Sequence, residues 1–348
     1  MKKGRMMSGR RVLAIASTAA LSVGVVACGS DSSSSGGGGG GGGGSKKVTI
    51  GLITKEDSNP FFIAMKGAAQ DAAKKDNVDL ITAAGKNDAD NASQVNAIEQ
   101  MTTQGAKGIL ITPADTKAII PAVKKARAAG VTVIALDTPT DPQSAVDALY
   151  ATDNLKAGIA IGKYAKALAT KMGIKPVIGM LDLAPGITVG KLRHEGFLQG
   201  FGIKDGDPAI AGSVDTLGEQ AKGQTGMEQL LQKNPNINIV YSINEPSGFG
   251  GATALKSAGK DPKNYILVSV DGGCDAINKG INKGIIDATS QQYPSLMASD
   301  GVKNIAAAAR GGKKPTGYHD TGVTLITNNP MKGVDSKDGK YGSQHCWG

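Results

Sequence analysis

From residue 48 onward the chain alternates short apolar runs with longer amphipathic segments. The apolar runs have the length and β-branched content of buried strands, and the segments between them repeat apolar residues at helical spacing. Strands and helices that alternate with short links predict an α/β fold built from doubly wound parallel sheets. The expected strands are 48–53, 78–82, 107–112, 131–136, 176–181, 208–214, 237–242, 264–270 and 284–289. The expected helices are 61–76, 90–104, 115–129, 154–170, 188–202, 219–233, 247–258, 274–280 and 294–311.

The regular alternation is interrupted between residues 141 and 153, and a second strand–helix series follows. Two such series predict two similar α/β domains with a cleft between them, and 348 residues are enough for both. We expect one domain to comprise 47–152 plus about 293–320, and the other 153–292 plus about 321–348, joined by a hinge.

The amino terminus has the pattern of an export signal. Residues 1–27 carry five basic side chains and no acid, and their apolar stretch is too short for a comfortable membrane span. Ala27-Cys28 at its end resembles the bacterial lipobox, which implies cleavage before Cys28 and a lipid on its thiol. The alternative is a signal peptide with a chance cysteine. Residues 28–46, rich in Ser and Gly, then predict a flexible tether to the membrane.

The basic balance of the chain is partly a property of this signal. The net charge is +9, and the first 27 residues supply five of the positive charges. The remainder is only mildly basic, so the sequence predicts no nucleic-acid partner.

If Cys28 is lipidated, Cys274 and Cys346 remain, and in an oxidising compartment they suggest a disulfide that pins the carboxyl tail. Two free thiols are the alternative.

Polar residues stand where the apolar runs end. Because the carboxyl ends of parallel strands meet at one crevice, these side chains are expected to form two facing rims of hydrogen-bonding groups. Taken singly, each is also explained as a helix cap or turn residue, which is the better explanation for Asp115. The runs in question are Lys55-Glu56-Asp57, Thr112-Pro113-Ala114-Asp115, Asp137-Thr138, Asp182, Asn244-Glu245 and Asp271-Gly272-Gly273.

The first of these loops leads into Asn59-Pro60-Phe61-Phe62. Pro60 suits the first turn of a helix. Two aromatic rings beside an amide that both donates and accepts suit a sugar, which has apolar C–H faces and a rim of hydroxyls. Both rings could equally be part of the core.

Catalytic patterns are weak throughout. The three His residues are scattered, without metal-ligand spacing, and neither a Ser nucleophile elbow nor a phosphate-binding loop is present. Gly248 to Gly251 partly imitates a dinucleotide fingerprint, but the third glycine is missing and four residues separate it from the strand. An acid–base pair among Asp137, Asp182 and Asp271 is possible in principle. We therefore expect no enzyme, no catalytic residue, no cofactor and no metal.

Taken together, these motifs resemble the ribose-type family of bacterial sugar-binding proteins that feed ABC importers, and most closely its fructose-binding branch. The resemblance extends in the same order over nearly all of residues 48–348. Its motifs are Gly51 to Lys55, Asn59 to Phe62, Ile109 to Pro113, Ala135 to Thr138, Ala151 to Asn154, Met180 to Leu183, Arg193 with Gly196-Phe197, Gly223 to Thr225, Asn244 to Pro246, Val270 to Gly272, Ser290 to Pro294 and Cys346-Trp347-Gly348.

The resemblance implies a type I periplasmic binding protein fold and a set of ligand-binding residues. That set is Lys55, Asn59, Phe61, Phe62, Asp137, Thr138, Arg193, Asn244, Asp271 and Gln292. Two of them depart from the ribose pattern: Thr138 replaces an Arg, and Lys55 replaces a small hydroxyl residue. The second stacking ring of ribose binders has no match at Thr216 to Glu219. These departures favour a sugar other than ribose, with fructose as first choice.

The expected function is capture of one monosaccharide by hinge closure and its delivery to membrane permease subunits. We expect a monomer, exported and anchored to the outer face of the cytoplasmic membrane or present in the periplasm. Three alternatives remain: a binding protein that presents a sugar-like signal or polyol to a chemosensor, a repressor of the same fold, and a sugar-modifying enzyme. No helix-turn-helix precedes residue 48, which weakens the repressor. Ribose or another pentose or hexose remains an alternative ligand.

Overall fold

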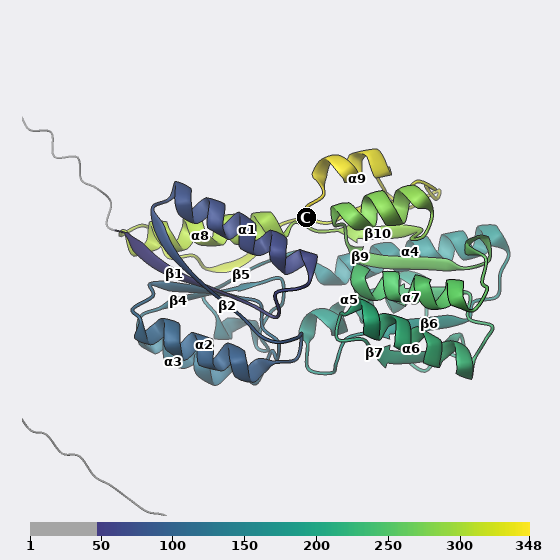
Figure 1. Cartoon of the computed structure of the whole chain (residues 1–348). Helices are drawn as coiled ribbons and strands as arrows, with labels where there is room; N and C mark the ends of the chain where they lie inside the picture. The colour runs from purple at the N-terminus through teal and green to yellow at the C-terminus, as the bar shows by residue number, and fades with distance from the viewer. Residues whose placement is uncertain (1–46) are drawn as a thin grey trace, which may run out of the picture. The chain divides into compact units, whose positions relative to one another are not determined.

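Two six-stranded sheets organise residues 47–348, which are the residues that the computed structural model describes (Figure 1). Each sheet is covered by helices on both faces, so the expected α/β fold with two doubly wound domains is confirmed. The expected signal peptide (1–27), the lipidation site Cys28 and the tether that ends at residue 46 lie outside the described residues. Within residues 47–348, no helix has both the length and the apolar character needed to span a bilayer.

The first lobe contains an all-parallel sheet in the order β11-β5-β4-β3-β1-β2. Helices α1 and α8 pack together on one face, and α2 and α3 cover the other (Figure 1). The strands are β1 (Val48–Thr54), β2 (Val78–Ala84), β3 (Gly108–Ile111), β4 (Thr132–Leu136), β5 (Ala148–Ala151) and β11 (Gly317–Asp320). The helices are α1 (Pro60–Lys75), α2 (Asn91–Thr103), α3 (Ile120–Ala128) and α8 (Pro294–Ala309).

The second lobe repeats this plan in the order β12-β10-β9-β8-β6-β7, with β12 antiparallel at one edge. Helices α4 and α5 pack on one face, and α6 and α7 on the other. The strands are β6 (Ile178–Asp182), β7 (Ile210–Asp215), β8 (Ile239–Ser242), β9 (Ile266–Asp271), β10 (Ala288–Gln291) and β12 (Thr324–Ile326). The helices are α4 (Asn154–Met172), α5 (Thr188–Phe201), α6 (Gln220–Lys233), α7 (Glu245–Ser257) and α9 (Gly339–His345).

Three short segments connect the two lobes, between β5 and α4, between β10 and α8, and between β11 and β12. Two of them are tied together, because the Thr152 hydroxyl donates to the carbonyl of Gly322 at 2.9 Å. Because three connecting segments run through the same hinge region, the two lobes can move relative to each other mainly by bending about it. The distribution of strands between the sheets supports the domain boundaries that we propose, 47–152 with about 293–320 and 153–292 with about 321–348.

Several expected elements and boundaries are wrong, among them both edge strands that come late in the sequence. Strands β5, β11 and β12 and helix α9 were not expected, the last expected strand (284–289) lies instead at β10, and the helix expected from 115 begins at Ile120. Residues 276–280 form π-helical turns rather than an α-helix. All four residues of the edge strand β11, Gly-Tyr-His-Asp, are exposed, so this strand has no alternation of buried and exposed residues for a sequence pattern to detect.

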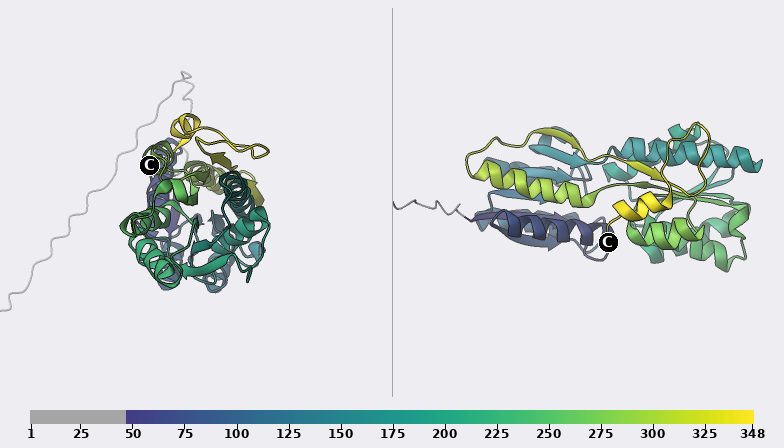
Figure 2. Two further views of the ribbon diagram at one scale, coloured as in Figure 1. Left: turned by 90° about the vertical axis from the view of Figure 1, so that its right-hand side faces the viewer. Right: turned by 90° about the horizontal axis from the view of Figure 1, so that it is seen from above.

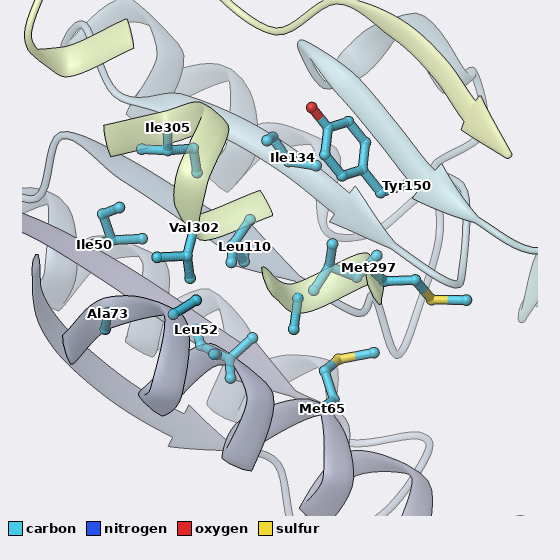
Figure 3. Packing of buried hydrophobic residues seen from close by; sticks show 14 of the residues in the cluster. Ile50, Leu52, Met65, Ala73, Leu110, Ile134, Tyr150, Met297, Val302 and Ile305 are labelled. Carbon is cyan, nitrogen blue, oxygen red and sulfur yellow. The ribbon is translucent and has the colours of Figure 1, made fainter. Parts of the chain in front are cut away.

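The first lobe's core lies between its sheet and the pair α1 and α8 (Figure 3). Ile50 and Leu52 of β1 face Met65 of α1 and Val302 of α8 in this cluster, and all four side chains are buried. Consecutive buried residues on β1 explain its continuous apolar run, since both faces of a parallel sheet are covered. This packing fixes the carboxyl end of β1 and the start of α1, where the candidate site begins.

Helices α4 and α5 approach each other through glycine, which yields a prediction about stability. A Cβ at Gly196 would lie 2.3 Å from the Leu155 carbonyl oxygen, so Gly196→Ala requires the helix backbones to separate. We expect this variant to lower the free energy of unfolding by about 2 kcal/mol, measured by urea denaturation. Gly67→Ala is the matched control, because its Cβ would meet nothing within 4 Å and alanine favours a helix by about 0.5–1 kcal/mol. Equal stability of both variants would contradict the prediction.

Candidate functional site

The strand ends of both lobes meet around one small cavity. Nine of the ten expected ligand-binding residues line it: Lys55, Asn59, Phe61, Phe62, Asp137, Arg193, Asn244, Asp271 and Gln292. The tenth, Thr138, is fully buried beside it and donates to Asp137 Oδ2 at 2.9 Å. The free volume of the cavity is about 20 Å³, room for about one water molecule, so a larger ligand enters only if the lobes part.

The start of helix α1 forms the aromatic wall. Asn59 is the N-cap, its side-chain oxygen accepting from the Phe61 amide at 2.9 Å, and Pro60 takes the first helical position. This cap fixes the direction of the two following rings. Phe61 and Phe62 pack edge to face with centroids 5.4 Å apart. Both rings belong to the first lobe's core cluster and also line the cavity, so their place in the core does not remove them from the cavity wall.

A buried ion pair stands beside the rings. Lys55, at the end of β1, places Nζ 3.6 Å from Asp88 Oδ2, and both side chains are almost completely buried. Burial raises the pKa of Asp88 to about 6, although the Lys55 cation opposes this shift. Among the described residues, Asp88 Oδ1 is buried without a hydrogen-bond partner. This carboxyl therefore presents an unused acceptor at the cavity.

Asp88 was not among the expected site residues. It lies in the loop between β2 and α2, where Asn87 to Asp90 has the composition of an ordinary turn before a helix. Asp90 does cap that helix, accepting from the Ser93 amide at 3.1 Å. The strand-end rule applied to the second expected strand would have pointed to this loop, because β2 lies parallel to β1 in the sheet.

Arg193 on α5 is the centre of the polar network. Its Nε donates to Asn154 Oδ1 at 2.8 Å, and Nη1 donates to the Ile243 carbonyl at 3.0 Å and to Asp271 Oδ1 at 3.2 Å. Its Nη2 donates to Asp137 Oδ1 at 3.4 Å, which joins the second lobe to the first. Only 4% of Arg193 is exposed, so these charge-assisted bonds form out of water, where they are strongest.

Acidic groups exceed cations in this network. Asp88, Asp137 and Asp271 face Lys55 and Arg193. Burial raises the pKa of Asp271 to about 7; Arg193 opposes the shift, and the nearby Asp137 carboxyl adds to it. An excess acceptor among buried carboxylates favours a ligand that brings hydroxyl donors.

The two aspartates that contact Arg193 have unusual backbone conformations. Asp137 follows β4 with φ of 59°, and Asp271 ends β9 with φ of 131°. Residues other than glycine rarely adopt positive φ. Backbone strain of this kind costs about 1–3 kcal/mol and is found most often at functional sites. The strain turns both carboxylates to one point between the lobes, within 3.4 Å of the same guanidinium.

The remaining wall comes from the second lobe. Asn244 caps α7 by accepting from the Ser247 amide at 3.1 Å, and its amide donates to the Gly218 carbonyl at 3.0 Å. Gln292, in a segment that connects the lobes, donates to Asp271, and its Oε1 is a second buried acceptor without a partner in the described chain. Apolar contact is supplied by Leu183, Val189 and Ile243.

Several strand-end side chains do not line the cavity. Asp182 lies 3.0 Å from Nδ1 of His194 and accepts from Ser213, and this carboxylate raises the His194 pKa to about 9. Asp115 accepts from the amides of Lys117 and Ala118 as a turn residue. For Asp115 the turn role favoured from the sequence is confirmed. The expectation that each strand-end side chain points into the crevice is wrong for Asp182, and Glu56, Asp57, Thr112 and Glu245 do not line the cavity either. Within residues 47–348, no cluster of His, Cys, Asp and Glu has the arrangement of a metal site.

Comparison with known proteins places this geometry in a family. Residues 50–314 match the model described as a periplasmic binding protein domain. The ribose import binding protein RbsB of Bacillus subtilis is 32% identical over 252 residues, which is 72% of this chain and 78% of that protein. A sugar transporter from Clostridium phytofermentans has a TM-score of 0.73 and 27% identity, covering 82% of this chain and all of the other. A solute-binding protein from Actinobacillus succinogenes with bound D-allose has a TM-score of 0.70 and 27% identity, covering 81% and 98%.

Proposed function

The chain belongs to the ribose-type periplasmic sugar-binding proteins of ABC importers, which are not enzymes, and we propose that it captures fructose in the cavity between its lobes. The proposed ligand-binding residues are the ten expected from the sequence together with Asp88. Relatives named for ribose or crystallised with D-allose make both sugars alternatives to fructose.

The observation that carries this proposal is a pair of buried acceptors at one cavity, Asp88 Oδ1 and Gln292 Oε1, which have no hydrogen-bond partner within residues 47–348. Leaving a buried acceptor unsatisfied costs about 1–3 kcal/mol, and a ligand with hydroxyl donors removes that cost. Arg193 supplies donors on the same cavity, and the Phe61 and Phe62 rings supply an apolar face. Donors, acceptors and rings around one point match the surface of a monosaccharide.

Capture requires motion of the lobes. The cavity walls come from both lobes, and Lys55, Asp137, Arg193 and Asp271 are each at most 4% exposed. We infer that the lobes open about the connecting segments to admit the sugar and then close around it. The Arg193–Asp137 contact forms only on closure, because its two residues come from different lobes.

The residues that line the cavity are the reason for proposing fructose rather than ribose. Lys55 and Asp88 form a buried charged pair beside the rings, and Thr138 cannot supply the cation that an Arg would supply at that position. The second lobe contributes aliphatic Leu183 and Val189 and no second stacking ring in this lining. A displaced cation and a missing ring favour a sugar with a different hydroxyl arrangement from ribose.

The cellular role follows from the family and the amino terminus. The family is extracytoplasmic, and we propose that Cys28 carries a lipid that holds the protein at the outer face of the cytoplasmic membrane. The closed form would dock as a monomer on the permease subunits of an ABC importer. Nothing in this role calls for a cofactor or a nucleic acid.

A panel of sugars tests the ligand. Fructose at about 1,000 times its dissociation constant is expected to stabilise the protein by about 4 kcal/mol and to raise the melting midpoint by several degrees in differential scanning fluorimetry. Ribose, D-allose and sorbitol are compared at equal concentration, and calorimetry then measures each dissociation constant. A shift with ribose but none with fructose would overturn fructose, and no shift with any sugar would overturn the sugar-binding proposal.

A further inference from the structure

The carboxyl tail is fastened to the second lobe beside the site. Cys346 is disulfide-bonded to Cys274, with the two Cα atoms 4.9 Å apart, and the Cys274 amide donates to the Trp347 carbonyl at 2.9 Å. Cys274 follows the Asp271-Gly272-Gly273 turn that ends β9. The carboxyl terminus consequently lies at the junction of the lobes (Figures 1 and 2).

The Trp347 ring contacts residues of the candidate site in two directions. It packs edge to face on Phe61 of the first lobe, with centroids 5.4 Å apart and planes at 82°. Its Nε1 donates to the Gln292 carbonyl at 2.8 Å, in the segment that joins β10 to α8. The side chain is 8% exposed and belongs to the first lobe's core cluster, although the tail is bonded to the second lobe.

The ring also contacts the backbone that follows Asp271. A Cβ at Gly273 would lie 3.2 Å from Trp347 Cζ3, so the ring rests directly on the turn that follows Asp271. Three residues of the cavity wall are thus adjacent to Trp347 or to its support: Phe61 by ring contact, Gln292 by hydrogen bond and Asp271 through its turn. Trp347 itself does not line the cavity.

We propose that Trp347 is a positioning residue of the sugar site, held in place by the Cys274–Cys346 disulfide. The proposal rests on the proposed sugar-binding function. The ring fixes the orientation of Phe61, and the indole donor fixes the backbone that carries Gln292. Because the tail is attached to one lobe and packs on the other, Trp347 also contributes to the closed arrangement.

The test uses fructose as the probe and calorimetry as the first readout. Trp347→Ala is expected to weaken fructose binding at least about tenfold, because Phe61 loses a ring partner and a buried carbonyl loses its donor. Trp347→Phe keeps a ring and loses only the donor, so it is expected to restore part of the affinity. Tyr341→Ala is the matched control: this tail aromatic stacks on His345 and packs against the second lobe, and binding within about twofold of wild type is expected.

Fluorescence gives a second readout, because Trp347 is the only tryptophan in the sequence. In the sugar-free double variant Cys274→Ser/Cys346→Ser, the emission maximum is expected to shift to longer wavelength as the ring becomes hydrated. The same variant is expected to bind fructose several-fold more weakly. Circular dichroism checks that each variant is folded. If Trp347→Ala does not fold, Trp347→Phe and the double variant still test whether Trp347 positions the sugar site.

Three outcomes would overturn the proposal: fructose affinity within twofold of wild type in Trp347→Ala, an equal loss in Tyr341→Ala, or unchanged emission in the double variant. If the wild-type protein binds no sugar, the proposed function fails on that result alone. The sugar-free emission of the double variant then still decides whether the disulfide holds Trp347 in place.

Discussion

Arg193→Ala is expected to abolish sugar binding, lowering the affinity at least about a thousandfold. Its guanidinium contacts Asp137, Asp271, Asn154 and a backbone carbonyl while 4% exposed. Removing one partner of a buried ion pair costs about 3–5 kcal/mol, because the remaining charges lose their compensation. Here two carboxylates are left facing each other, so the free energy of closing the lobes rises together with the loss of ligand contacts.

Calorimetry with fructose measures this effect, and urea denaturation measures the accompanying loss of stability. Lys191→Ala is the matched control, since Lys191 is on the same helix, 72% of its side chain is exposed, and within the described residues it forms an ion pair only with Glu195, one turn away. An exposed pair of this kind contributes little. Affinity within tenfold of wild type in a folded Arg193→Ala protein would contradict the assignment of the site.

The sequence predicted the fold well where elements are buried on both sides. The continuous apolar runs of β1, β3, β4 and β9 follow from a parallel sheet covered by helices, and these strands were located within one or two residues. Strands β5, β11 and β12, at or next to a sheet edge, are three or four residues long, and β11 pairs with β5, which lies far away in the sequence. Local pattern contains no information about such pairing.

The candidate site divides in the same way. Asp137, Asn244 and Asp271 follow from the rule that parallel strands end at one crevice, without any family knowledge. Arg193 lies mid-helix on α5, where its sequence suggests an ordinary surface residue, and only the family resemblance identified it. Asp88, Asn154 and Trp347 were missed as contributors. The strand-end rule would have pointed to the loop that carries Asp88, whereas Asn154 acts through Arg193 and Trp347 through Phe61, contacts between residues far apart in the sequence that no local pattern encodes.

Asp137→Ala is expected to lower fructose affinity about a hundredfold or more. The carboxylate accepts from Arg193 Nη2 at 3.4 Å and from the Thr138 hydroxyl at 2.9 Å. Its loss therefore removes the hydrogen bond between Arg193 and a side chain of the first lobe. Truncating one partner of a buried hydrogen-bonded charge pair costs about 2–5 kcal/mol. Asp137→Asn keeps the shape and one acceptor, and it is expected to bind with intermediate affinity.

The backbone at Asp137 requires a control of its own. Its φ of 59° disfavours alanine more than aspartate, whereas glycine adopts this conformation without strain. Asp137→Gly therefore separates loss of the carboxylate from changes in the turn: equal loss of binding in the Gly and Ala variants assigns the effect to the carboxylate, and recovery in the Gly variant contradicts it. Because Asp137 and Arg193 share one bond, the double variant Asp137→Ala/Arg193→Ala is expected to lose less affinity than the two single losses combined. Strict additivity in that cycle would mean that the contact between the lobes does not operate when sugar is bound.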